Sequence, residues 1–187
     1  DVPGTETATE AGAETGVGTA AEEPGRVDLL PDFGVAVARM GPTYLALTNG
    51  RVGTEGVGNH KHNDQLAIEW VVDGRPILVD GGSYTYTQDP ASRNRFRSTA
   101  THNTVMVDGE EQHGINPAWL FRTEQMGEAT LTVVPPGPQG CGVAGHHTAY
   151  GRLTPPVTHR RRALVLPDGT VALEDLFDGA PGHSLRW

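Results

Sequence analysis

Two histidines that stand two residues apart are the first candidates for chemistry in this chain. His60 and His62 lie in the segment GNHKHNDQLAIE, directly before an apolar run that predicts a strand. Side chains at positions i and i+2 of an extended backbone share a face, so both imidazoles could point into one space. Such a pair could bind a metal ion or transfer protons, and it is equally common as plain polarity in a solvated loop. The pair alone leaves both alternatives open.

Asp80 and His102 also stand where apolar runs meet loops. Asp80 ends the run RPILVD and is followed by two glycines, whereas His102 opens the run HNTVMV. A carboxylate at the end of a strand is often only a turn former. If the strands that carry His62, Asp80 and His102 are neighbours, two imidazoles and one carboxylate converge and leave a fourth position open. That ligand set suits Zn²⁺, although the sequence separations match no short metal-binding motif.

The elements that must position these residues are short strands. From Phe33 onward, runs rich in Val, Leu, Ile and Thr alternate with Gly, Pro, Asn and Asp. This rhythm predicts an all-β fold, an antiparallel β-sandwich with few or no helices. The pairs Asp73-Gly74 and Asp168-Gly169 stand between apolar runs and predict hairpin turns. The predicted strands are residues 33–39, 44–48, 65–72, 76–79, 103–107, 119–123, 129–134, 158–166, 170–176 and 184 onward.

The composition separates an N-terminal segment from the rest of the chain. Residues 1–26 hold six acidic side chains against one arginine and no aromatic residue. They cannot bury enough apolar surface to offset the entropy of ordering, so we expect a flexible acidic linker followed by a sandwich over 27–187.

Charge and hydropathy exclude several classes of partner. No run approaches the roughly 18 apolar residues of a membrane-spanning helix, so membrane insertion is not expected. The formal net charge is −9 and no basic stripe is present, which argues against nucleic acid. Cys141 is the single cysteine and cannot form an internal disulfide. We expect it in a Gly- and Pro-rich loop, and we expect His146 and His147 to be exposed.

The segment 58–109 resembles the signature region of the heparinase II/III-like polysaccharide lyases. The matching motifs are the histidine pair with Asp64, LVDGGSYTY ending at Tyr86, RNRFRST at 93–99 and HNTV at 102–105. Gly81 and Ser83 depart from the usual Pro and Thr of the family, and neither change removes a proposed ligand. The resemblance implies a C-terminal β-sandwich domain that follows an N-terminal helical toroid, with the active site in the cleft between them. This chain would then be part of a larger protein.

The resemblance also assigns roles to individual residues. It implies that His62, Asp80 and His102 bind one zinc ion, whose main task is to hold the loops that face the cleft. By the same correspondence His60 faces the substrate as a catalytic residue, and Asn59 and Tyr84 line the cleft.

Two further residue types suit an acidic polysaccharide. Arg97 is predicted to contact substrate, because a guanidinium matches a carboxylate bidentately, although Arg93, Arg95 and Arg97 could equally be structural. Trp119 is either a core residue or a platform for a sugar ring.

The function implied by the resemblance is that of a polysaccharide lyase, which cleaves uronic-acid-containing polysaccharides by β-elimination. The partners are an acidic polysaccharide and the helical toroid of the same protein, and the expected location is periplasmic or secreted. In this family the main tyrosine and its partners come from the helical domain, so we expect the isolated sandwich to be inactive. The alternative is a non-catalytic carbohydrate-binding or structural β-sandwich.

Overall fold

The structure, a computed structural model, describes residues 25–53, 58–179 and 181–187. Its first sheet is an antiparallel meander in which each strand pairs with the next along the chain. The Asp73-Gly74 pair makes its last turn with positive φ angles of 50° and 70°, as a tight hairpin of this type requires. The strands are β1 (Arg26–Leu30), β2 (Val35–Met40), β3 (Thr43–Thr48), β4 (Ala67–Val72) and β5 (Arg75–Leu78).

The second sheet has four antiparallel strands in the order β12-β11-β10-β9. Its members are β9 (Ala129–Gly137), β10 (Gly140–His147), β11 (Thr158–Val165) and β12 (Val171–Asp178). The predicted Asp168-Gly169 turn joins β11 to β12, where Val165 pairs with Val171. In β11 alternate residues are buried, so one face of this strand points to the core.

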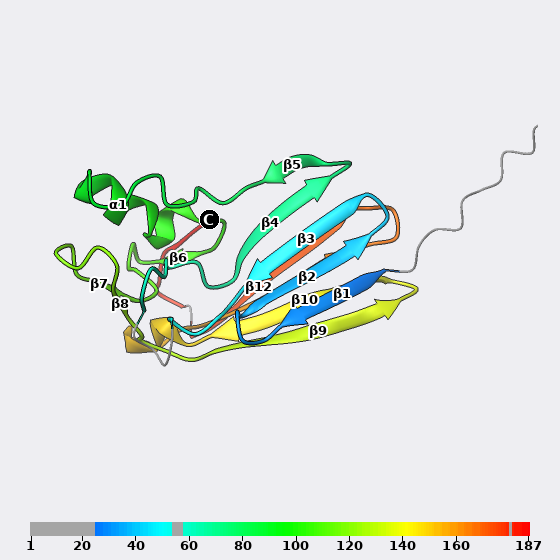
Figure 1. The fold of residues 1–187 in the computed structure, drawn as a ribbon. Helices are drawn as coiled ribbons and strands as arrows, with labels where there is room; N and C mark the ends of the chain where they lie inside the picture. The colour runs from blue at the N-terminus through cyan, green and yellow to red at the C-terminus, as the bar shows by residue number, and fades with distance from the viewer. Residues whose placement is uncertain (1–24, 54–57, 180) are drawn as a thin grey trace, which may run out of the picture.

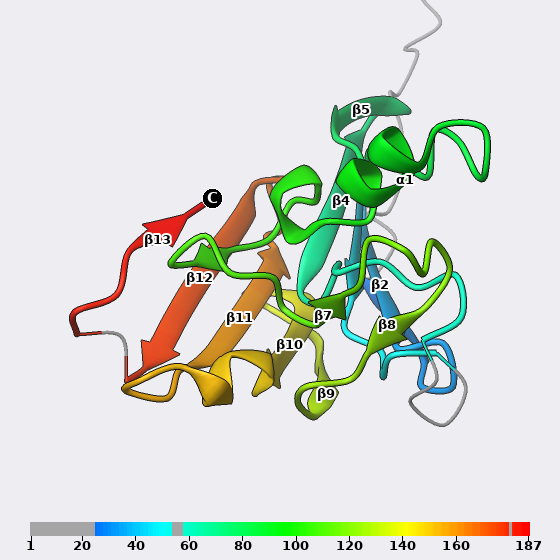
Figure 2. The same cartoon turned by 90° about the vertical axis from the view of Figure 1, so that its left-hand side faces the viewer.

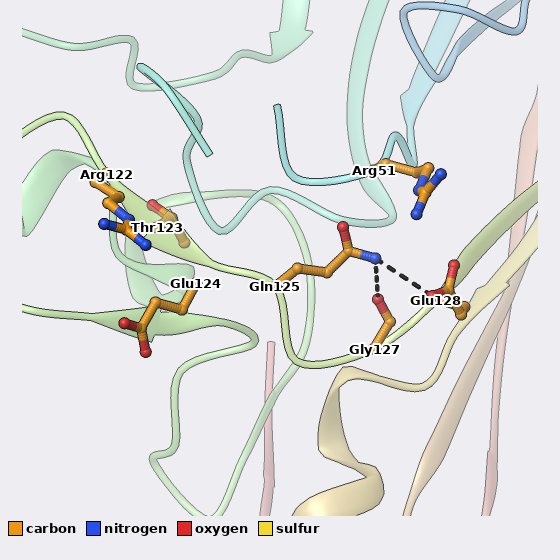
Figure 3. Close-up of a pocket in the computed structure, with 7 residues that line it drawn as sticks. All are labelled: Arg51, Arg122, Thr123, Glu124, Gln125, Gly127 and Glu128. Atoms are coloured by element: carbon orange, nitrogen blue, oxygen red, sulfur yellow. Dashed lines mark hydrogen bonds between the residues drawn. The ribbon is translucent and has the colours of Figure 1, made fainter. Parts of the chain in front are cut away.

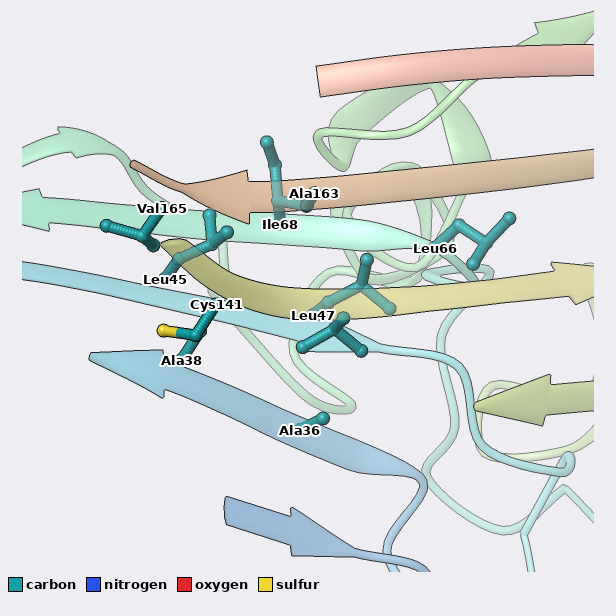
Figure 4. Close-up of a cluster of buried hydrophobic side chains, with 10 residues drawn as sticks. Ala36, Ala38, Leu45, Leu47, Leu66, Ile68, Cys141, Ala163 and Val165 are labelled. Atoms are coloured by element: carbon teal, nitrogen blue, oxygen red, sulfur yellow. The ribbon is translucent and has the colours of Figure 1, made fainter. Parts of the chain in front are cut away.

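The two sheets pack face to face and bury a common core (Figure 1). Leu45, Leu47, Leu66 and Ile68 meet side chains of β10 and β11 in this core, which Figure 4 shows. The small side chains of β2, Ala36 and Ala38, allow this strand to lie close to β10. The predicted antiparallel β-sandwich is therefore confirmed.

The shorter elements gather at one end of the sandwich, which faces the viewer in Figure 2. One pair of short strands joins β6 to β13, and another joins β7 to β8. These elements are α1 (Pro90–Phe96), η2 (Thr99–Thr101), β6 (Met106–Val107), β7 (Gly114–Ile115), β8 (Thr123–Glu124), η3 (Ala149–Arg152) and β13 (Leu185–Arg186).

Strand β10 was not among the predicted strands, because the sequence GCGVAGHH is rich in glycine. The glycines are required by close contact with the next strand: a Cβ on Gly142 would lie 2.1 Å from the carbonyl oxygen of Ala163. Cys141 therefore lies buried in a strand and not in a loop. His147 is likewise fully buried, so the expectation that it is exposed is wrong.

Three other local expectations need correction. Strand β1 was not predicted and begins at Arg26, one residue before the expected domain boundary. The predicted strand 119–123 is a series of turns that enters β8 only at Thr123. The predicted strand 103–107 is reduced to Met106–Val107.

The predicted acidic linker, residues 1–26, lies outside the described residues except for its last two positions. Among the helices that the structure describes, none is long and apolar enough to cross a membrane.

Candidate cleft and metal-binding site

The loop between β3 and β4 presents the two histidines at the end of the sandwich that carries the shorter elements. Gly58 starts this segment with a φ of +69°, and a Cβ there would lie 2.0 Å from the carbonyl oxygen of Thr123. Only glycine allows this close approach. The loop is thereby held against the segment that leads into β8.

His60 points to a group of aromatic side chains. Its φ is +57°, so the backbone is not extended here and the i, i+2 argument for a shared direction does not apply. The imidazole is exposed and lies 4.8 Å from the ring of Phe121 and 5.9 Å from the ring of Tyr86, between ring centroids. Its backbone N–H donates to the carbonyl oxygen of Phe121 at 2.8 Å. His60 is thus an accessible imidazole on a fixed backbone.

His62 faces the other two predicted metal ligands. Its ring centroid lies 5.3 Å from that of His102, and His102 Nδ1 lies 2.5 Å from Asp80 Oδ1. The second oxygen of Asp80 accepts from the backbone N–H of Gly82 at 2.7 Å. The structure therefore brings His62, Asp80 and His102 together, although they come from three separate loops.

The surroundings of these residues favour a neutral imidazole beside an ionised carboxylate. Burial lowers the pKa of His62 to about 4, and the neighbouring His102 and the guanidinium of Arg93 lower it further. Burial alone would raise the pKa of Asp80, but the hydrogen bonds from His102 and from the backbone of Gly82 lower it on balance. Neutral imidazole and ionised carboxylate are the forms that bind a metal ion.

The three residues fit a zinc site in the chemistry of their side chains. An ionised Asp80 can only accept, so His102 donates from Nδ1, and its Nε2 is left buried without a hydrogen-bond partner. A lone pair at Nε2 suits a metal ion. Asp80 bonds the other nitrogen of the same ring, so it must leave that hydrogen bond to become a ligand of the same ion. Within the described ranges, however, no three such donors are arranged around one point.

Arg93 competes for the lone pair of the other imidazole. Its Nη1 donates to His62 Nε2 at 2.7 Å, and the hydroxyl of Ser83 lies 3.3 Å from the same nitrogen. The guanidinium also lies over the rings of Tyr86 and Phe121, at 5.9 Å and 5.5 Å from their centroids. Zinc on His62 Nε2 therefore requires this guanidinium to move.

The two residues that the family resemblance places along the cleft are both at the surface. Asn59 and Tyr84 are exposed, and the Tyr84 ring stacks on Phe96 with a centroid distance of 5.0 Å. Both are therefore accessible to a ligand.

Arg97 does not have the exposure that its predicted role requires. The residue is fully buried and donates to the carbonyl oxygens of Arg122 at 2.7 Å and Asn116 at 3.0 Å. Two further bonds go to the side chain of Asn94. Because its donors are used inside the domain, Arg97 is a structural residue here, and the prediction of substrate contact is corrected.

Sequence reasoning missed Glu111, a carboxylate that joins the two histidine-bearing loops. Glu111 Oε2 accepts from Asn63 Nδ2 at 2.7 Å and from the N–H and hydroxyl of Thr99 at 2.8 and 2.9 Å. Its Oε1 accepts from the hydroxyl of Ser98. The only sequence signal was an acidic pair in DGEEQHG, which does not distinguish this residue from its exposed neighbour Glu110.

Comparisons with known proteins show the family of this chain through a family model and its fold through solved structures. Residues 22–187 match the family model described as Heparinase II/III-like, C-terminal. A crystal structure of heparinase III superposes with a TM-score of 0.64 at 21% identity, covering 82% of this chain and 22% of that one. The heparan sulfate lyase HepC from Pedobacter heparinus superposes with a TM-score of 0.60 at 20% identity and the same coverage. The chain thus spans about a fifth of the length of these structures, and no curated protein sequence matches it significantly.

Proposed function

Because this chain belongs to the heparinase II/III-like family through its C-terminal domain, we propose that it forms one wall of the active-site cleft of a polysaccharide lyase. The substrate class is a uronic-acid-containing polysaccharide. The observation that carries the proposal is the exposed imidazole of His60, held by backbone and aromatic contacts beside the three predicted metal ligands. The helical domain of the family supplies the opposite wall, and the location is periplasmic or secreted.

The proposed reaction is a β-elimination. A base removes the proton on C5 of the uronate, its electron pair forms the C4=C5 double bond, and the C4–O bond breaks. The leaving oxygen takes a proton from an acid. Negative charge develops on the uronate carboxylate during proton removal, and hydrogen-bond donors that are already in place stabilise it. His60 and its exposed neighbour Asn59 are the proposed donors, whereas the base and the acid come from the helical domain.

We further propose that His62, Asp80 and His102 bind a zinc ion. The support is the convergence of the three residues and the unpartnered Nε2 of His102. The ion would fix the loops that carry His60 and Tyr84, and no step of the elimination passes through it. Asp80 would exchange its hydrogen bond to His102 for the metal, and Arg93 would release His62.

The lyase test uses the longer protein in which this domain follows a helical domain. Cleavage is followed by the ultraviolet absorbance of the new C4=C5 double bond on unsulfated and sulfated uronate polymers. His60→Ala should reduce the rate by about 100-fold or more, as expected when one hydrogen-bond donor to developing negative charge is removed. His146→Ala is the matched control, because that histidine lies on the other sheet and bonds only Thr130 through its side chain. A parent protein that binds acidic polymers and never cleaves them would favour the non-catalytic alternative.

A further inference from the structure

A rigid, exposed turn lies beside His60 and has no role in the function proposed above. The segment 116–122 is held at both ends by the buried guanidinium of Arg97, which bonds the carbonyl oxygens of Asn116 and Arg122. Between these points the backbone carbonyl of Phe121 accepts from His60. The turn is therefore fixed relative to the candidate catalytic imidazole.

This turn borders a hollow of about 400 Å³. Trp119 is 43% exposed, so part of its indole is available to a ligand. The hollow is open, and an aromatic wall with a few polar groups suits a sugar ring that lies against the surface. The lining residues are Asn59, Ala118, Trp119, Leu120, Phe121 and Arg122.

Arg122 gives the hollow a positive charge. Its guanidinium lies over the indole of Trp119, 4.9 Å from the ring centroid. A guanidinium stacked on a ring keeps its in-plane N–H donors free for a carboxylate. In the part of the chain that the structure describes, no carboxylate lies within 4.0 Å of this guanidinium. The chain as a whole carries a net charge of −9, so the unneutralised positive charge of Arg122 contrasts with the negative charge of the rest of the protein.

Arg122 also lines a second hollow, which holds carboxylates as well as the guanidinium of Arg51. It contains Glu124 and Glu128, and Gln125 lies between Arg51 and Arg122 and donates to Gly127 and Glu128 (Figure 3). The two carboxylates offset the two guanidinium groups there, whereas the lining of the Trp119 hollow holds no acidic side chain. An anion paired with Arg122 is therefore expected on the Trp119 side.

We propose that the hollow at Trp119 and Arg122 is a subsite for an acidic sugar residue, next to the residue bound at His60. One face or edge of the indole packs against the sugar ring, and Arg122 pairs with its carboxylate or sulfate. Phe121 links the two positions, because it lines the hollow and lies 4.8 Å from the His60 ring. The inference rests on the proposed function for the polymeric nature of the ligand, and it adds the residues that select an acidic sugar.

Binding without catalysis tests this subsite on the 187-residue chain. Isothermal titration calorimetry is run with an unsulfated hexauronate, a heparin hexasaccharide and neutral cellohexaose. The two acidic probes distinguish a carboxylate from a sulfate as the group that Arg122 recognises. We expect Trp119→Ala and Arg122→Gln each to weaken binding of the preferred acidic probe by about tenfold or more. Arg75→Gln, an exposed charge change on the β4–β5 hairpin, should leave binding unchanged.

Salt dependence and fold controls make the outcome unambiguous. Added salt should weaken the parent more than Arg122→Gln, because the variant lacks the screened ion pair. Trp119→Phe keeps an aromatic face and should recover part of the affinity, and circular dichroism should show that each variant is folded. Unchanged affinity in both variants, equal binding of cellohexaose, or no binding of either acidic probe by the parent would each overturn the subsite. Loss of lyase activity in His60→Ala is measured separately, so this subsite and the lyase function can fail independently.

Discussion

Arg93 and His62 are joined by a hydrogen bond that occupies a predicted metal-binding atom. Arg93 Nη1 lies 2.7 Å from His62 Nε2, and 1% of the arginine is exposed. Within the described ranges this guanidinium has no carboxylate within 4.0 Å and rests instead on the rings of Tyr86 and Phe121. Burying a cation without a neighbouring anion costs free energy, so the Arg93 guanidinium is poorly stabilised in this position. Zinc and Arg93 are therefore expected to compete for one lone pair.

Replacing Arg93 should strengthen zinc binding. A hydrogen bond to a charged group contributes about 1.5–3 kcal/mol, so Arg93→Gln should lower the zinc Kd by roughly tenfold or more. The Kd is measured by competition with a chromophoric chelator. Arg95→Gln is the control, because Arg95 is exposed on the same helix. Weaker zinc binding in Arg93→Gln than in Arg95→Gln would show that Arg93 supports the metal site and does not compete with it.

Zinc should stabilise the fold through the three predicted ligands. A ligand present at 100 times its Kd stabilises the folded state by about 2.7 kcal/mol. We expect zinc to raise the Tm of the parent chain, and His62→Ala and Asp80→Ala to abolish this rise and the zinc content found by elemental analysis. His146→Ala should keep both. A metal-free parent whose Tm does not respond to zinc would refute the metal site.

Glu111 should stabilise the two histidine-bearing loops far more than its neighbour does. It accepts four hydrogen bonds from Asn63, Ser98 and Thr99, whereas Glu110 makes one exposed ion pair of 3.4 Å with Arg152. Glu111→Gln turns one acceptor into a donor that faces other donors, with an expected loss of about 2–4 kcal/mol.

The paired substitution Glu110→Gln should change stability by less than about 1 kcal/mol, as is usual for an exposed ion pair. Urea unfolding of both variants measures the difference. Glu111→Gln should also weaken zinc binding, because Asn63 and Thr99 flank His62 and His102 along the chain. Equal stability of the two variants would mean that Glu111 does not hold these loops together.

The parts of the fold that follow local rules were predictable from the sequence. Asp73-Gly74 and Asp168-Gly169 form the expected turns, and the burial of β11 alternates as its sequence indicated. The start of helix α1 also has a local sequence signal. The side chain of Asp89 caps the helix by accepting from the backbone N–H of Ser92, and Pro90 occupies the first turn. Such features depend on neighbours within a few residues.

The parts that depend on distant residues were not predictable. Strand β10 forms because glycines fit against β11, and the turn at 116–122 is held by Arg97 from another segment. Arg97 itself resembled a substrate ligand, since a guanidinium that bonds backbone carbonyls has the same sequence signature as one that bonds a sugar carboxylate. The convergence of His62, Asp80 and His102 was expected from the family motif, and local spacing alone left it undecided.

Two buried histidines should make the fold sensitive to acid. Burial lowers the pKa of His113 to about 4, with help from the charges of Lys61 and Arg152, and lowers the pKa of His147 well below its usual value. In the unfolded chain both imidazoles bind a proton below about pH 6.5. As the pH falls from about 6.5 toward 4, the unfolded state therefore binds more protons and the free energy of unfolding decreases. The pKa of His183 is raised by Asp108, so its contribution has the opposite sign.

Each buried neutral histidine should contribute a slope of up to about 1.4 kcal/mol per pH unit, so we expect His113 and His147 together to account for a loss of about 3 kcal/mol between pH 6.5 and 5. Urea unfolding at closely spaced pH values measures this slope. His113 Nδ1 accepts from Met126 N–H and His147 Nδ1 accepts from Ala149 N–H. Asparagine provides a similar acceptor without titrating, so His113→Asn and His147→Asn should each reduce the slope by up to about 1.4 kcal/mol per pH unit. His146→Asn should leave it unchanged, and a parent whose stability is constant over this range would contradict the burial of neutral imidazoles.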